Sequence, residues 1–378
     1  MKEFDYIFAG AGCAGLSMIY HVLNSPLKDK RILLIDPHFG EIPNKTWCYW
    51  AKEALPIHPE KSLNQHWSKF SLGTKNQNRT YEFDQLKYWH INSKEFYEFI
   101  LPQINSSDSI EIVQDSVVEI YENDSEAFVR TKSESFSSKY VFDSRLSEKN
   151  NQNSNSLKQV FAGWRVEFDS PVFDPTTFSL MEVDDSSSKD FSFFYVLPHS
   201  DRSALIEFTK YDTDRTSLKE LKGAIKDYIS DKFGDIEYKI TFEEDGIIPM
   251  STLHNSIHSE RLIPIGTRAG WTKPSTGYTF FTIQKNCEIL LEKLQNGEPL
   301  SLTPKESRFK FYDNILLNIA HNWPSQLKTV FLNLFHQNPP DQVFRFLGEQ
   351  TSLREEFQIL RRLRFGIFIK SLITYGKY

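Results

Sequence analysis

The sequence predicts an α/β fold in which two glycine-rich segments, far apart in the chain, belong to one domain. The residues between them are expected to include an insertion in that domain. The first segment is AGAGCAG near the start, and the second is GTRAGWTKPSTGYTFF, from Gly266 to Phe281. An apolar stretch precedes each of them and helical apolar spacing follows. We expect a mixed-sheet domain between the two segments and a helical region at the C-terminal end.

The opening of the chain is expected to form a βαβ unit. Tyr6 to Ala9 is a short apolar strand, and Arg31 to Ile35 is a second one that ends at Asp36. Between them Leu16, Ile19, Tyr20 and Leu23 recur at helical spacing.

Further elements follow from apolar alternation and turn residues. A helix is expected from Ser93 to Ile100 with Ser93 as its cap, and another from Ser217 to Phe233. The segments FSFFYVLP and ALIEFTKY are expected to pair as a hairpin around HSDRS. Other expected strands are 110–113, 116–121, 127–131, 140–143, 160–167, 177–183 and 263–265; polar loops are expected at 147–156 and 184–190, and helices at 281–294 and beyond about Lys310.

The expected division of the chain has five parts. Residues 1–75 are the N-terminal βαβ segment and 76–150 are strands of the same domain or of its insert. Residues 151–245 form the sheet of the substrate domain, 246–295 return to the first domain, and 296–378 form the helical region.

Composition excludes some classes of function. The chain has 378 residues and a net charge of -6, which argues against nucleic acid as a partner. Three widely spaced cysteines show no CxxC pattern, so neither a disulfide framework nor a metal site is expected. No run of 18 apolar residues and no secretory signal is visible, and a cytoplasmic location is expected. The 31 Phe and 16 Tyr fit either a compositional bias or a large apolar tunnel.

The first glycine loop has the GxGxxG spacing of a dinucleotide site. Gly10 permits the turn, Gly12 lets the backbone approach a pyrophosphate, and Gly15 lets the helix pack on the strand. The helix N-terminus favours phosphate charge. Asp36, 21 residues beyond Gly15, is placed to bind an adenosine ribose. The alternative is a glycine-rich turn with an ordinary surface aspartate.

The second glycine segment favours FAD over NAD. Gly266 and Gly270 flank a turn, and Pro274, Thr276 and Gly277 precede a helix. Small residues at these positions allow backbone amides to lie against a flavin. The alternative is a βα turn with packing glycines.

Five motifs in the same order resemble the lycopene cyclases of carotenoid biosynthesis. The segment KPSTGY (Lys273 to Tyr278) is similar to that family's HPSTGY element, with Lys at the usual His position. The others are NKTWCYW (Asn44 to Trp50), FSLMEVD (Phe178 to Asp184), the hairpin from Phe193 to Thr209, and EEDGIIPM (Glu243 to Met250). The resemblance runs from residue 5 to about 285, and the last 90 residues match only loosely.

The resemblance implies a glutathione-reductase-type, Rossmann-like FAD-binding domain and a sheet-containing substrate domain. It also implies a reaction that needs reduced FAD without net redox change, with NAD(P)H as a possible flavin reductant. The implied substrate is lycopene or a similar linear carotene, whose ψ-end groups are protonated, cyclised through a carbocation and deprotonated to β-rings.

That chemistry needs an acid in an apolar site, and Glu207 matches the expected position. Leu205, Glu207 and Thr209 alternate onto one face of their strand, which is expected to line the substrate pocket. Burial near a flavin would raise the pKa of the Glu207 carboxyl and keep it protonated. The family often has two consecutive acids here, whereas Phe208 follows Glu207 in this chain. The alternative is an exposed strand residue.

Other candidate residues are expected from the same motifs. Trp47 and Tyr49 line the pocket or belong to the core, and Glu182 orients a hydrogen-bond network there or caps a strand. Arg145 contacts a flavin phosphate or lies on the surface. Lys45 and Lys273 replace histidines common in the family, so no histidine relay is carried over.

The end of the chain is basic and amphipathic. Residues 354–378 carry Arg354, Arg361, Arg362, Arg364, Lys370 and Lys377 among apolar side chains, against Glu355 and Glu356. This pattern fits a helix lying on an anionic membrane surface, or a helix packed on the core with a charged outer face.

Two other functions use the same scaffold. One is a flavin-dependent isoprenoid reductase or hydroxylase, which would consume NAD(P)H with its product. The other is a non-catalytic carotenoid or lipid carrier.

Overall fold

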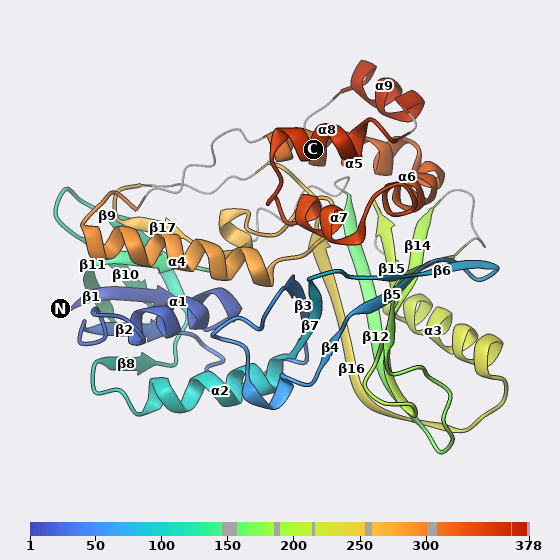
Figure 1. Cartoon of the computed structure of the whole chain (residues 1–378). Helices are drawn as coiled ribbons and strands as arrows, with labels where there is room; N and C mark the ends of the chain where they lie inside the picture. Colours follow the sequence, from blue (N-terminus) through green and yellow to red (C-terminus); the bar gives the residue numbers. More distant parts are fainter. Residues whose placement is uncertain are drawn as a thin grey trace.

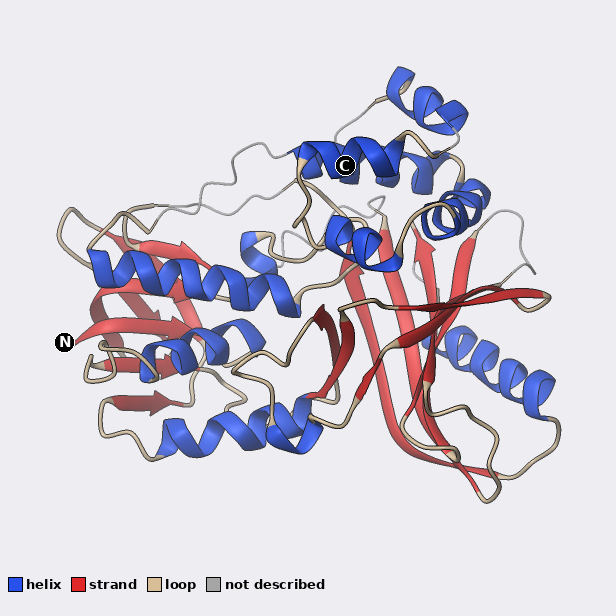
Figure 2. Ribbon diagram, in the orientation of Figure 1, coloured by secondary structure: helices blue, strands red, loops and turns tan. Residues whose placement is uncertain are grey.

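The computed structural model describes residues 1–145, 157–184, 190–213, 216–253, 259–300, 308–363 and 365–375. Two large sheets lie side by side, with a small three-stranded sheet between them (Figures 1 and 2). The expected polar loop at 147–156, and residues 185–189 of the other one, lie outside the described residues.

The central strands of the first sheet are parallel, and they come from both the early and the late part of the chain. Its order is β8-β2-β1-β11-β10-β9, and β17, from late in the chain, pairs in parallel with the end of β11. The two glycine segments therefore follow strands of one sheet, as expected. The strands are β1 (Lys2–Ala9), β2 (Ile32–Ile35), β8 (Ile110–Val113), β9 (Val117–Glu122), β10 (Ala127–Thr131), β11 (Ser135–Asp143) and β17 (Leu262–Pro264).

Apolar residues cover both faces of this sheet. Helix α1 (Cys13–Leu23) packs between α2 (Ser93–Asn105) and α4 (Phe280–Asn296) and buries one face (Figure 1). The β9–β10 hairpin contributes to a second core on the other face. Parallel strands buried on both faces explain the continuous apolar runs ILLI and YIFA.

The second sheet is mostly antiparallel, with the order β16-β12-β15-β14-β13-β5-β6. Its strands are β5 (Lys69–Thr74), β6 (Gln77–Glu82), β12 (Lys158–Phe168), β13 (Thr177–Val183), β14 (Phe191–Pro198), β15 (Ser203–Asp212) and β16 (Tyr238–Pro249). The β14–β15 hairpin confirms the expected pairing. Strands β5 and β6 come from residues that the sequence had assigned mainly to the first domain, so this sheet draws on a wider part of the chain than expected.

The small sheet joins β3 (Thr46–Ala51), β7 (Lys87–Asn92) and β4 (His66–Trp67). It lies between the two large sheets, and β3 contacts α4 (Figure 1). The 3-10 turn η1 (Glu60–Ser62) lies beside β7.

Helix α3 (Leu218–Phe233) covers the outer face of the second sheet. Ser217 caps it with a capping box to Glu220. On β15, Ala204, Ile206 and Phe208 face this helix in one core cluster, as the expected alternation requires.

The helical C-terminal region covers the upper end of the second sheet in Figure 1. It contains α5 (Arg308–Asn322), α6 (Pro324–His336), α7 (Pro340–Leu347), α8 (Leu353–Leu360) and α9 (Phe365–Ile373). Among the described residues, no helix combines the length and apolar character needed to traverse a bilayer.

The expected cap of α2 is wrong by one residue. The Asn92 side chain, not Ser93, accepts the Lys94 N–H at 2.9 Å. The Ser93 hydroxyl instead accepts the Lys45 N–H at 2.9 Å and donates to the Pro43 carbonyl. Ser93 thus fixes the chain that enters β3, which forms part of the site below.

Candidate active site

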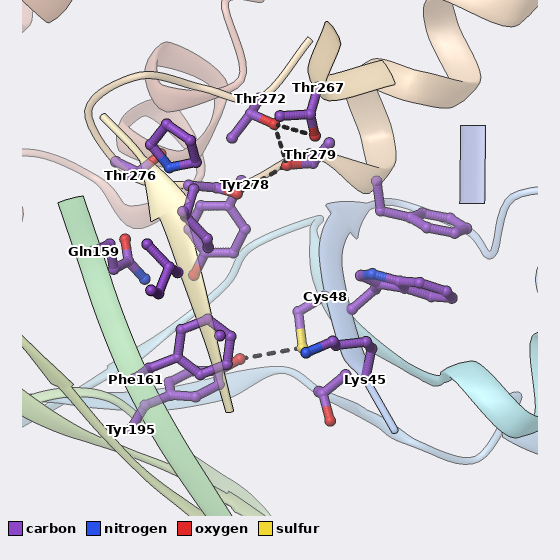
Figure 3. A pocket seen from close by; sticks show the side chains of 18 of the residues that line it. Lys45, Cys48, Gln159, Phe161, Tyr195, Thr267, Thr272, Thr276, Tyr278 and Thr279 are labelled. Carbon is purple, nitrogen blue, oxygen red and sulfur yellow. Dashed lines mark hydrogen bonds between the residues drawn. The ribbon is translucent and has the colours of Figure 1, made fainter. Parts of the chain in front are cut away.

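One large cavity lies between the first domain, the small sheet and the inner face of the second sheet. Its volume is about 960 Å³, at the upper end of the usual range for ligand sites. Figure 3 shows side chains from all three parts converging on it. Its lining includes Gly12, Cys13, Ala14, Lys45, Trp47, Cys48, Phe161, Tyr195, Glu207, Glu244, Gly270, Thr276 and Gly277.

The first glycine loop opens into one end of this cavity. Gly12 is the cap residue of α1 and offers no side chain to its first amides. A Cβ at Gly12 would meet no atom within 4 Å, whereas one at Gly15 would lie 2.2 Å from the Gly10 carbonyl oxygen. Gly15 therefore serves helix packing, while Gly12 leaves open space in front of a helix N-terminus.

The second glycine segment forms the adjoining wall. The turn η3 (Gly266–Ala269) ends at Gly270, and Gly270 and Gly277 both have positive φ. The hydroxyls of Thr267 and Thr279 both bond to that of Thr272, at 3.2 and 3.1 Å (Figure 3). Of the predicted residues, Gly270, Thr276 and Gly277 line the cavity, whereas Gly266 and Pro274 are not among its lining residues.

Asp36 and Arg145 are engaged within the protein. Asp36 accepts the Ala11 N–H at 2.7 Å and the His38 N–H at 2.8 Å, so it shapes the glycine loop directly. The Arg145 guanidinium bonds to Asp143 and to the Val117 carbonyl, and it is not part of the cavity lining. The predicted phosphate contact of Arg145 has no support in this arrangement.

Four residues form one lateral row across the second sheet. Tyr195 of β14 is in register with Glu207 of β15, which is opposite Gly163 of β12, which is opposite Glu244 of β16. Glu207 and Glu244 both line the cavity. Glu244 was not predicted as a site residue, although Glu244, Gly246 and Ile248 alternate in EEDGIIPM and all three line the cavity.

Burial and the nearby Glu244 charge raise the pKa of the Glu207 carboxyl to about 8. The Thr209 hydroxyl, fully buried, bonds to Glu207 Oε1 at 2.5 Å. That hydrogen bond favours the charged form and opposes the effect of burial, so the net result is a raised pKa for Glu207, the direction that an acid role requires.

Aromatic side chains surround the row. The Tyr195 hydroxyl lies 3.1 Å from Cys48 Sγ and 2.8 Å from the Tyr88 hydroxyl, which lies 2.7 Å from that of Tyr278. Trp47 stacks on Phe280 at 6.0 Å. Helices α6 and α7 contribute Phe331, Phe335, Phe344 and Leu347 to the lining of the cavity.

The other predicted pocket residues divide into three groups. Trp47 lines the cavity, while Tyr49, Leu205 and Thr209 are buried beside it and are not in its lining. Tyr49 bonds to His58 at 2.8 Å and stacks on Phe280. The placement of Glu182 in the pocket is wrong, because its carboxylate bonds to Tyr228 and Lys232 of α3 on the outer face of the sheet.

The two lysines that replace histidines have different partners. Lys45 lines the cavity and its ammonium donates to the Asp245 carbonyl. Lys273 points away, into a buried ion pair with Asp313 at 2.9 Å and a partly exposed one with Glu349 at 2.7 Å. Lys273 therefore ties the second glycine segment to the helical region.

The residues at the glycine end fit an FAD molecule. An uncapped helix N-terminus beside an open Gly12 suits a pyrophosphate. The same cavity continues along Thr267 to Phe280 and reaches Glu207, so a flavin ring could lie between the phosphate end and the carboxylate row.

Solved structures place this fold among flavin enzymes. A geranylgeranyl bacteriochlorophyll reductase-like protein from Thermoplasma acidophilum matches with a TM-score of 0.62 at 11% identity, covering 99% of both chains. A flavoprotein/dehydrogenase from Cytophaga hutchinsonii matches at 0.63 and 10%, covering 99% of this chain and 100% of that one. The flavin-dependent brominase Bmp2 matches at 0.60 and 12%, covering 99% of both. This chain thus shares its fold with flavoproteins of more than one activity.

Sequence similarity places this chain in a smaller group of proteins than the shared fold does. The sequence profile described as lycopene cyclase protein matches residues 5–372, so this chain belongs to the lycopene cyclase family. A lycopene beta-cyclase from Paracoccus sp. (strain N81106 / MBIC 01143) is 31% identical over 129 residues, which span 32% of this chain and 32% of that protein.

Proposed function

We propose that this protein is an FAD-dependent lycopene β-cyclase that converts linear ψ-end groups to β-rings without net redox change. The observation that carries the proposal is a carboxyl group, Glu207, that lines the same cavity as the dinucleotide-type loop at Gly12; burial raises its pKa. Membership of the lycopene cyclase family supports the substrate class.

Glu207 would start the reaction by giving its proton to the terminal double bond of the end group. The polyene then closes a ring on the resulting tertiary cation, and the cyclised cation loses a different proton. One proton enters and one leaves, so the product is an isomer of the substrate.

The cavity walls suit a cationic intermediate. Trp47, Phe161 and Tyr195 present aromatic rings, which stabilise positive charge. The apolar residues of α6 and α7 exclude water that would otherwise trap the cation as an alcohol. When bound in its reduced form, FAD supplies an electron-rich ring near the same place.

The deciding experiment compares the wild type with Glu207→Gln. Each is incubated anaerobically with lycopene and reduced FAD, and the products are separated by chromatography. We expect cyclic product from the wild type and a loss of at least about 100-fold in the variant, with FAD still bound. A variant with wild-type activity would remove Glu207 from the mechanism.

The same experiment distinguishes the other functions of this scaffold. A reductase or hydroxylase would consume NAD(P)H in proportion to its product. A carrier would return lycopene unchanged.

We also propose that the helical end docks on a membrane, from which the enzyme takes its apolar substrate. Helices α8 and α9 expose Phe357 by 67% and Ile373 by 80%, together with Leu353, Phe365, Ile369 and Leu372. Glu355 and Glu356 are paired with Arg345 and Arg308, so the remaining charge beside these apolar residues is basic. Anionic lipid is the surface that fits this combination. Arg364 and Lys377 of the predicted basic segment lie outside the described residues.

A further inference from the structure

Glu244 extends over Gly163 on the inner face of the sheet. The two residues are in register between β16 and β12, and a Cβ built on Gly163 would lie 3.2 Å from Glu244 Cγ and 3.5 Å from Glu244 Oε1. On its other side Gly163 is opposite Glu207. Because glycine has no side chain, nothing from β12 separates the two carboxyl groups at this position.

The Glu244 carboxylate has one satisfied and one unsatisfied oxygen. Oε2 accepts the Thr46 N–H at 2.8 Å. Oε1 is buried and has no hydrogen-bond partner within the described part of the chain, and the whole residue is only 4% exposed. A buried carboxylate oxygen without a partner is unfavourable in a purely structural residue, but it suits a group that accepts a proton.

The surroundings of the two carboxyl groups differ. Glu244 receives a backbone N–H and lies near the cations Lys45 and Arg165, which favour its charged form. Glu207 receives only the Thr209 hydroxyl and the weaker influence of Lys45. Burial still raises the pKa of Glu244, to about 7. These contacts favour the proton on Glu207 and the negative charge on Glu244. The Cys48 thiol and the hydroxyls of Tyr195 and Tyr278 are further titratable groups nearby.

We propose that Glu244 is the base that takes the final proton from the cyclised cation. This inference rests on the proposed cyclase function and names the group that completes it. The C–H bond on the ring carbon that carries the polyene breaks, its electrons form the ring double bond, and the proton goes to Glu244. Glu207 is then the carboxylate and Glu244 the acid, and transfer of one proton between them restores the starting state.

The position of this base would also decide whether the product carries a β-ring or an ε-ring. Removing the proton from the carbon that carries the polyene gives a β-ring, whereas removing it from the ring methylene on the other side gives an ε-ring. A fixed carboxylate selects one of these hydrogens by position.

The test is Glu244→Gln, with Glu243→Gln as the matched control. The amide oxygen of Gln can still accept the Thr46 N–H, so FAD binding and folding are expected to persist. We expect β-ring formation to fall by at least about 100-fold, with part of the residual product carrying the double bond at another ring position. Glu243 pairs with Lys222 at the surface, so its substitution is expected to leave the rate unchanged.

The pH dependence gives a second readout. Activity of the wild type should fall at low pH as Glu244 becomes protonated, and at high pH as Glu207 loses its proton. In Glu244→Gln the low-pH fall should disappear from the residual activity, whereas Glu244→Asp should retain it with an intermediate rate.

Three outcomes decide the matter. Wild-type rate and pH profile in Glu244→Gln would overturn the inference while leaving the cyclase function intact. Loss of FAD in Glu244→Gln together with an inactive Glu244→Asp would assign Glu244 a structural role and also overturn it. Absence of any cyclic product from the wild-type protein would instead refute the proposed function itself.

Discussion

Gly163 lies directly opposite Glu207 in the β12–β15 ladder, and the same glycine faces Glu244 on its other side. The strand register thus places the two carboxyl groups in one lateral row of the sheet, and the residue between them has no side chain. The Glu244 charge contributes to the raised pKa of Glu207.

Replacing Gly163 with alanine should disturb this arrangement. The added Cβ would lie 3.2 Å from Glu244 Cγ and 3.3 Å from Leu205 Cδ1, tighter than most Cβ contacts, so these side chains would have to shift by a few tenths of an ångström. We expect Gly163→Ala to lower the cyclisation rate by about 10-fold or more, as small displacements of reacting groups do, with FAD affinity retained. Gly223→Ala is the control, since a Cβ there meets nothing within 4 Å on α3. Equal activity of both variants would show that the row tolerates a methyl group.

Gly12 and Gly15 should respond differently to the same substitution. A Cβ on Gly12 meets no protein atom, so Gly12→Ala should fold normally and lose bound FAD, because the methyl group takes the space for the pyrophosphate. A Cβ on Gly15 would collide with the Gly10 carbonyl, so Gly15→Ala should lower the melting temperature even without FAD. Flavin absorbance of the purified variants and thermal unfolding measure the two effects. An FAD content in Gly12→Ala equal to that of the wild type would contradict this placement of the phosphates.

The raised pKa values of Glu207 and Glu244 predict a stability that falls with pH. Both values are higher in the folded protein than the ordinary 4.5, so the folded state binds more protons than the unfolded state above that pH. Stability contributed by the protonated Glu207 carboxyl is therefore lost as pH rises towards about 8.

Glu207→Gln removes this dependence at one site. We expect the variant to match the wild type near pH 4.5 and to melt at a higher temperature at alkaline pH. Thermal unfolding across the range, with FAD absent from both proteins, measures the difference. A constant difference at every pH would mean that Glu207 does not titrate between the two values.

Helix α9 should be needed for attachment to lipid. Phe365, Ile369 and Ile373 recur at four-residue spacing and are 53%, 53% and 80% exposed, so they share one face. The triple substitution of these residues by Asp should abolish sedimentation with anionic vesicles and leave cyclisation in detergent unchanged. Val118→Asp with Leu218→Asp, on exposed apolar residues elsewhere, is the control. Wild-type protein that stays in the supernatant with vesicles present would contradict the docking proposal.

Local patterns account for much of the scaffold. The spacing of Gly10, Gly12 and Gly15 between apolar runs predicted the βαβ opening, because the apolar periodicity of a helix or a strand can be recognised within a short segment. The face of β15 that carries Glu207 followed from alternation alone. The cap of α2 was misplaced because Asn92 and Ser93 are both good caps, and the contacts of Ser93 with Pro43 and Lys45 come from a distant segment.

The sequence by itself therefore determined the glycine loops, the hairpin and the face of β15 that carries Glu207, since each depends on neighbours in the chain. Only the tertiary structure decided that Glu244 joins Glu207, that Glu182 faces α3 instead of the cavity, and that residues 69–82 belong to the second sheet. These outcomes depend on which strands pair and in what register, and those pairings are made between segments that no local pattern connects.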